Sequence, residues 1–194
     1  MAAAILLIAG GALIDAAGPT RQPPPLSHSG PHAIGPLPAA PALPRSEPAT
    51  LSIPALGLTA DLDHIGMKPD GTVQDPVTFE RPSWYDLGAA PGERGSAVIL
   101  GHVDSYRGPA IFFRLGELRA GDAVAVTRAD GATARFVVTR TETVPKDAFP
   151  AQSVYADHGD AELQLVTCGG DFDSARRTYR ANVIVYTTLV RTSG

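Results

Sequence analysis

Residues 161–190 read AELQLVTCGGDFDSARRTYRANVIVYTTLV, and this stretch decides the fold class. Its two apolar runs, 161–168 and 181–190, are rich in valine, isoleucine and threonine, which favour strands. A polar segment with two adjacent glycines separates the runs. Short apolar runs bounded by turn residues predict β-strands rather than helices.

The same pattern recurs earlier in the chain. Comparable runs occupy residues 51–56, 96–103, 122–128 and 134–141. The step Asp130-Gly131 predicts a hairpin between the last two of these runs. The spacing is too tight for repeated strand–helix–strand crossovers, and the two helical candidates, 111–118 and 145–156, are short. We therefore predict that residues 50–194 form one mostly β domain, either a barrel or a sandwich.

The N-terminal region has a different composition. Ten of the 18 prolines lie in residues 1–49. Proline fixes φ and removes the amide donor, so residues 19–49 are predicted to be a disordered linker of polyproline II character. A proline-rich recognition motif is the weaker interpretation, because no strongly basic anchor flanks a PxxP segment.

Residues 1–18 are apolar, and residues 2–14 carry no charge. Thirteen helical residues would span roughly 20 Å, which is less than the roughly 30 Å hydrocarbon core of a bilayer. Three interpretations remain open: a signal-peptide core without its basic start, a membrane anchor shortened by a late start codon, and a mobile apolar tail. We favour export with membrane anchoring, because a proline-rich spacer follows directly.

The overall composition excludes several classes of function. The formal net charge is −4 and aromatic residues make up 6% of the 194 residues, which argues against nucleic-acid binding. The single cysteine rules out an intrachain disulfide framework and a multi-cysteine zinc site. No glycine-rich phosphate loop is present, and we expect no cofactor.

That single cysteine, Cys168, is a candidate nucleophile. It follows the run 161–167 and precedes Gly169-Gly170, where we expect the strand to end and the side chain to face a groove. A free thiol is only slightly ionised at neutral pH, so a nucleophile needs a cation or an imidazole nearby. His102 is the natural partner, because it ends another apolar strand after Gly101, which permits close approach. The other interpretation is a buried, inert cysteine.

Arginines are concentrated after the cysteine, at Arg176, Arg177 and Arg180. A guanidinium can hold a substrate carbonyl or stabilise an oxyanion. Arg180 opens the last strand, and Arg176 and Arg177 are expected in a solvated loop. His64 and His158 lie in polar surroundings and are predicted to be surface residues.

Taken together, GH in AVILGHVDS, TC in LQLVTCGG and an arginine opening the next strand resemble the sortases, most closely the actinobacterial class E/F members. The resemblance covers about residues 50–190 and implies an eight-stranded closed β-barrel with short helices. It assigns Cys168 as nucleophile, His102 as the family histidine, Arg180 as the catalytic arginine with Arg177 as second choice, and Thr167 as a substrate contact. The calcium-binding acidic cluster of some sortases is not evident in this sequence, so we expect no metal requirement.

The resemblance implies cleavage of an LPXTG-like or LAXTG-like sorting signal between threonine and glycine, through a Cys168 thioester. An amine of a cell-wall precursor or a pilin would then accept the acyl group, and water would give slow hydrolysis. The partners would be surface proteins with a C-terminal sorting signal, and the domain would lie on the extracellular face of the cell membrane.

Two other functions remain open at this stage. An L,D-transpeptidase also uses cysteine and histidine on cell-wall peptides, but its nucleophile segment would read Ser-x-Gly-Cys, whereas Leu165-Val166-Thr167 precede Cys168. A non-catalytic exported β-barrel that binds a ligand would carry an inert, buried thiol.

Overall fold

The computed structural model describes residues 40–190. The predicted apolar segment 1–18 and residues 19–39 of the predicted linker lie outside the described residues. Within residues 40–190, no helix is both long and apolar enough to cross a membrane.

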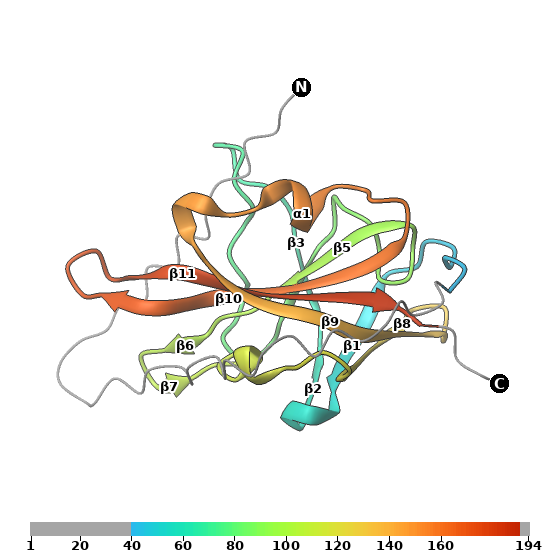
Figure 1. Cartoon of the computed structure of the whole chain (residues 1–194), viewed down its shortest axis with the longest axis horizontal. Coiled ribbons are helices and arrows are strands. Elements are labelled where there is room, and N and C mark those ends of the chain that lie inside the picture. Colours follow the sequence, from blue (N-terminus) through green and yellow to red (C-terminus); the bar gives the residue numbers. More distant parts are fainter. Residues whose placement is uncertain (1–39, 191–194) are drawn as a thin grey trace.

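The described chain forms one nine-stranded sheet of order β2-β1-β8-β9-β11-β10-β5-β4-β3 (Figure 1). Its strands are β1 (Pro48–Ile53), β2 (Leu58–Asp61), β3 (Asp63–Ile65), β4 (Ser83–Tyr85), β5 (Gly95–Leu100), β8 (Ala123–Arg128), β9 (Thr133–Pro145), β10 (Ala161–Asp173) and β11 (Thr178–Leu189). A separate two-stranded hairpin consists of β6 (Asp104–Ser105) and β7 (Gly108–Pro109). The helices are short: η1 (Pro54–Leu56), η2 (Leu115–Glu117), η3 (Lys146–Ala148) and α1 (Ala151–Tyr155).

The two edge strands of this sheet are consecutive in the chain. Only Leu62 separates β2, which pairs with β1, from β3, which pairs with β4. The first and last strands of the sheet are therefore halves of one bent segment, and the sheet nearly closes into a barrel. Counted this way the barrel has eight strands, so the predicted mostly β, barrel-like fold is confirmed.

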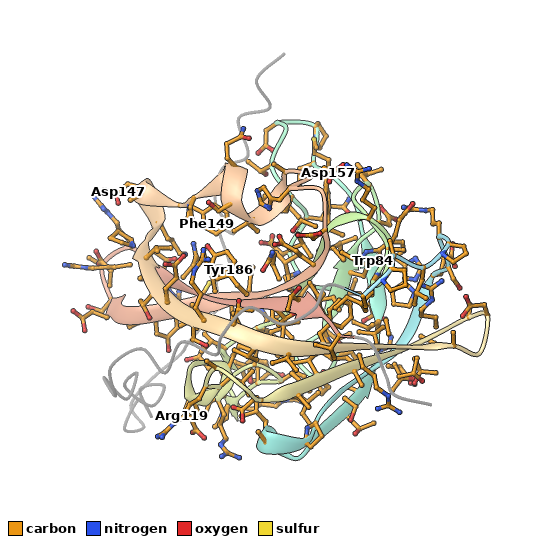
Figure 2. The ribbon with its side chains drawn as sticks, turned by 45° about the vertical axis from the view of Figure 1, so that its right-hand side comes forward. Trp84, Arg119, Asp147, Phe149, Asp157 and Tyr186 are labelled. Carbon is orange, nitrogen blue, oxygen red and sulfur yellow. The ribbon has the colours of Figure 1, made fainter. Side chains whose placement is uncertain are left out.

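Apolar side chains are buried on both faces of the curved sheet. The larger cluster fills the barrel and includes Leu163, Leu165, Val183 and Val185. The alternate residues Val166 and Ile184 belong to a second cluster on the other face, together with Phe149 and Tyr186. Figure 1 shows the β9–α1 connection over this second face, and Figure 2 shows Phe149 and Tyr186 on that side. Burial on both faces explains why these runs contain so few polar residues.

The structure corrects two expectations about individual elements. The strand that carries Cys168 does not end there but continues to Asp173, with a register shift against β11 between Gly169 and Phe172. Gly170 has a left-handed φ of 72°, and a Cβ on it would lie 2.9 Å from Ala181 Cβ. The helix predicted for 111–118 is reduced to the 3-10 turn Leu115–Glu117.

Residues before β1 pack against the barrel. The Leu43 amide donates to the Gly92 carbonyl at 2.7 Å, and Arg45 forms an ion pair with Glu93 at 2.9 Å. The fully buried Arg128 side chain donates to the carbonyl oxygens of Pro91 and Pro44. Residues 40–47 are therefore part of the folded domain.

Candidate active site

Cys168 lies on β10 in the centre of the sheet, directly opposite Asn182 on β11. Side chains alternate along a strand, so Cys168 shares its face with Val166 and the second apolar cluster. The thiol is partly exposed. Desolvation nevertheless raises its pKa, the positive charge of Lys146 lowers it in part, and the nearby carboxylates of Asp104 and Asp75 add to the rise.

His102 reaches the same end of the sheet from a neighbouring parallel strand. β5 and β10 run in parallel with Leu100 paired to Val166, and His102 and Cys168 each lie two residues beyond that pair. The Gly101 amide donates to the Val166 carbonyl at 3.1 Å, and the Thr167 hydroxyl donates to the Gly101 carbonyl at 2.7 Å. Backbone pairing therefore holds the histidine segment beside the cysteine segment.

The His102 ring is held by the connection between β3 and β4. Nε2 lies 3.0 Å from the Pro76 carbonyl oxygen, which can only accept, so this nitrogen carries a proton. The Phe79 ring packs against the imidazole with 4.6 Å between ring centroids. The Phe79 carbonyl in turn accepts from the Ile111 amide at 3.0 Å. Segments on both sides thus fix the orientation of the imidazole.

Asp104 joins the histidine loop to β11. The Tyr179 hydroxyl donates to Asp104 Oδ2 at 2.5 Å. Burial raises the pKa of the Asp104 carboxyl, and the Tyr179 hydrogen bond and the charge of His102 lower it in part. Desolvation and Asp104 also raise the pKa of Tyr179. Asp104 therefore acts electrostatically on both His102 and Cys168.

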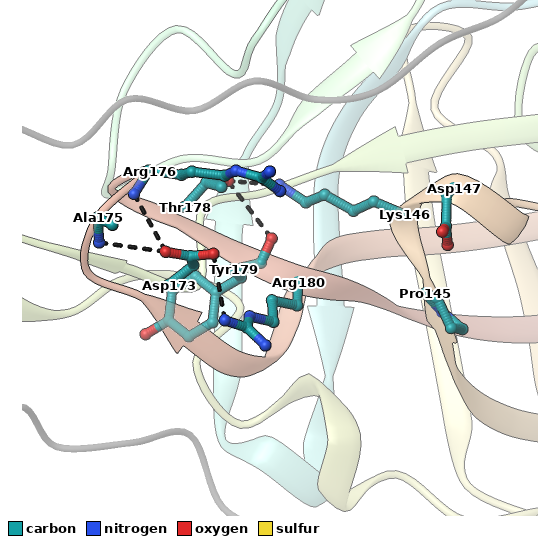
Figure 3. A pocket seen from close by; sticks show the side chains of 9 residues that line it. All are labelled: Pro145, Lys146, Asp147, Asp173, Ala175, Arg176, Thr178, Tyr179 and Arg180. Atoms are coloured by element: carbon teal, nitrogen blue, oxygen red, sulfur yellow. Dashed lines mark hydrogen bonds and ion pairs between the residues drawn. The ribbon is translucent and has the colours of Figure 1, made fainter.

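Arg180 lies on the same face of the sheet as Cys168, because it is two residues from Asn182 on β11. Its guanidinium, however, forms an ion pair with Asp173 at 3.3 Å, and its side chain is 68% exposed (Figure 3). Arg177 lies in the turn before β11, with a left-handed φ of 53°. The register favours Arg180, whose guanidinium contacts Asp173 through Nη2.

An open hollow of about 710 Å³ lies beside this arginine (Figure 3). It is lined by Pro145, Lys146, Asp147, Asp173, Ala175, Arg176, Thr178, Tyr179 and Arg180. The surroundings are mixed in charge, and the ion pair of Arg180 with Asp173 forms part of the wall.

Thr167 and Asn182 are both buried next to Cys168. The Thr167 hydroxyl is engaged with Gly101 inside the fold, so the substrate contact of this residue stays a prediction. Asn182 Oδ1 is buried and has no hydrogen-bond partner among residues 40–190. An unsatisfied buried acceptor costs about 1–3 kcal/mol, which is commonly tolerated at functional sites.

The structure brings Cys168 and His102 together and adds groups that sequence reasoning missed. Asp104, Tyr179 and Lys146 come from three different elements, and no short motif connects them. Asn182 was visible as a polar residue on the Arg180 face of an apolar strand. His64 and His158 lie on the surface, as expected. Within the described part of the chain, no three His, Cys, Asp or Glu side chains gather as metal ligands.

Comparisons with known proteins concern the family and the fold of the chain. Residues 51–190 match the family model described as Sortase domain. No curated protein matches the chain.

Among solved structures, sortase A from Corynebacterium diphtheriae is similar with a TM-score of 0.60 and 20% identity, over 77% of this chain and 63% of that one. Sortase C1 from Streptococcus agalactiae is similar with a TM-score of 0.58 and 19% identity, over 75% of this chain and 68% of that one. Sortase C-1 from Actinomyces oris is similar with a TM-score of 0.58 and 20% identity, over 74% of this chain and 73% of that one. At such identities the similarity shows the fold alone.

Proposed function

Because this chain belongs to the sortase family, we propose that it is a cysteine transpeptidase that cleaves sorting signals of the LPXTG or LAXTG type between threonine and glycine. The observation that carries the proposal is the parallel β5–β10 pair, which presents His102 and Cys168 from the same strand ends. Family membership supports the transpeptidase activity, and the backbone register that brings Cys168 and His102 to the same end of two paired strands supports the cysteine mechanism.

The reaction would begin with attack of the Cys168 thiolate on the threonine carbonyl carbon. Arg180 would leave Asp173 and stabilise the resulting oxyanion or hold the substrate backbone. Collapse of the tetrahedral intermediate breaks the carbon–nitrogen bond, and the departing glycine amine takes a proton from His102. A thioester between Cys168 and the threonine carbonyl remains.

An acceptor amine would then attack the thioester and lose a proton to His102, while the Cys168 thiolate leaves. We propose that this amine belongs to a cell-wall precursor or a pilin, and that the donors are surface proteins with a C-terminal sorting signal. The similarity to class E/F members, a membrane anchor in residues 1–18 and an extracellular location belong to the same proposal.

A cleavage assay tests the catalytic assignment. Fluorogenic LPXTG and LAXTG peptides are incubated with the full chain and an amine acceptor, and intact-mass spectrometry detects the acyl-enzyme. Cys168→Ala should abolish the acyl-enzyme, and His102→Ala should lower turnover by about three orders of magnitude or more. An acyl-enzyme that still forms in Cys168→Ala would overturn the proposal.

The two arginines are separated in the same assay. Arg180→Ala should lower turnover as severely as His102→Ala, because groups that act on one transition state are not additive. Arg177→Ala, the matched control in the adjoining turn, should retain most activity. The opposite result would transfer the oxyanion role to Arg177 and leave the assignments of Cys168 and His102 intact.

A further inference from the structure

Lys146 begins η3, at the point where β9 leaves the sheet. Val144 on β9 pairs with Asn182 on β11, and Asn182 pairs with Cys168 on β10. Val144 therefore lies at the same level of the sheet as the proposed nucleophile. Lys146 follows two residues after Val144. The chain thus brings a lysine to the edge of the site from a segment more than twenty residues away from Cys168.

The Lys146 side chain is held in place by β11. Nζ donates to the Thr178 hydroxyl oxygen at 2.8 Å, and the aliphatic chain extends along the hollow toward that residue (Figure 3). The ammonium lowers the pKa of the Cys168 thiol, through its charge and as a hydrogen-bond donor. Lys146 is therefore an anchored cation beside the sulfur.

The other charged and titratable groups around the sulfur come from several elements. Asp104 from β6 and Asp75 from the β3–β4 connection are negative, and both disfavour a thiolate. Asp75 forms an ion pair with Lys68 at 2.8 Å, and Asp104 accepts a hydrogen bond from the Tyr179 hydroxyl. His102 lies against Pro76 and Phe79.

The second cation on this face, Arg180, is paired with Asp173 and mostly exposed. An ammonium that acts on this partly exposed but desolvated sulfur offsets part of the desolvation and part of the negative charge of the two carboxylates. No bond to Lys146 changes during the reaction, and it keeps its protons throughout.

We propose that Lys146 is a further residue of the active site, and that its ammonium, anchored by Thr178, stabilises the Cys168 thiolate before substrate binds. This inference rests on Cys168 being the nucleophile of the proposed function. It assigns the lysine a role in the charge state of the sulfur, separate from the oxyanion role of Arg180.

The test is the pH profile of Cys168 alkylation by iodoacetamide, measured on the full chain by intact-mass spectrometry. Loss of the cation in Lys146→Gln should move the profile about one pH unit upward, so that the rate near pH 7 falls roughly tenfold. Lys146→Arg keeps the charge and should restore most of the rate. Thr178→Val keeps the lysine but removes its anchor, and should give an intermediate profile.

Arg176→Gln is the matched control, because it removes a cation that lines the same hollow without being one of the charges that act on Cys168. Its profile should match that of the unaltered chain. If Lys146→Gln also matches the unaltered chain, the proposal is wrong. If Lys146→Gln fails to fold, an unchanged profile in Thr178→Val contradicts the proposal instead.

Failure of this inference is distinguishable from failure of the proposed function. Alkylation needs no sorting peptide, so a shifted profile in a chain that cleaves no peptide would retain Lys146 and reject the transpeptidase. An unshifted profile in a chain that transfers acyl groups would reject only the role of Lys146.

Discussion

Asp104 links the segment that carries His102 to β11, and its ionised form is disfavoured by burial. Its carboxylate faces His102 and accepts the Tyr179 hydroxyl, which ties the histidine loop to β11. Burial makes the ionised carboxylate unfavourable and raises its pKa. For an acid with a raised pKa, the folded chain binds the proton more readily than the unfolded chain, so stability is lost as pH rises through the folded pKa.

Asp104→Asn should therefore remove a pH-dependent loss of stability. The variant amide can still accept the Tyr179 hydroxyl, but it carries no charge that burial penalises. Thermal unfolding between about pH 4 and pH 8 should show that the Tm of the variant, relative to the unaltered chain, increases with pH. Tyr179→Phe, which removes a hydrogen bond that lowers the Asp104 pKa, should make the loss of stability with pH steeper. A constant Tm difference for Asp104→Asn would contradict this account.

Residue identity alone suggested part of the candidate site. Cys168 and His102 were candidates because each follows an apolar run and because their residue types match a nucleophile and its acid–base partner. The orientation of Arg180 toward Asp173 and the approach of Lys146 could not be predicted, since both depend on how β9, β10 and β11 align.

Among the elements, the end of β5 is the most tightly constrained. A Cβ on Gly101 would lie 2.5 Å from Phe112 Cδ2, and the Phe112 ring is completely buried. The Phe112 amide also donates to the His102 carbonyl at 3.0 Å. The sequence predicted a close approach at Gly101, but it could not identify an aromatic ring as the neighbour.

Gly101→Ala should consequently lower both stability and activity. Overpacking of a full core costs about 1–3 kcal/mol, and relief of the clash would displace the segment that carries His102. Thermal unfolding and peptide cleavage measure the two effects. Phe112→Leu in the same chain should recover part of the stability. An unchanged Tm in Gly101→Ala would show that the ring moves without penalty.

Element boundaries were predicted less well than element types. The strand after residue 161 extends five residues past Cys168, because a register shift at Gly169-Gly170 lets the backbone continue to Asp173. The run 111–118 has only a 3-10 turn, since the surrounding segment contacts the His102 loop and the β3–β4 connection through its backbone amides. Such tertiary hydrogen bonds are invisible to local periodicity.

At the scale of the whole molecule, the barrel is completed by residues that precede its first strand. Leu43 and Arg45 form hydrogen bonds with the β4–β5 connection, and the Pro44 carbonyl satisfies one donor of the fully buried Arg128 on β8. Sequence composition assigned these residues to a linker, because proline content alone does not show which segments pack.

Two shortened chains test this contribution directly. A chain that begins at Pro48 should be less stable than one that begins at Ala40, because it leaves an Arg128 donor buried without its Pro44 acceptor. The difference should be about 2 kcal/mol or more, or roughly 5 °C in Tm for a domain of this size. Thermal unfolding of both chains under one buffer condition measures it. Equal Tm values would show that residues 40–47 contribute nothing to stability.

The pairing of β5 with β10 also determines when, during folding, the candidate active site is assembled. The two strands are joined by a long stretch of chain that includes β8 and β9, and parallel neighbours cannot be closed by a tight turn. Such distant contacts form late, since the entropy of the intervening loop opposes them. A newly made chain would thus carry an ordinary solvated sulfhydryl until the barrel closes, and its reactivity would report the completion of folding.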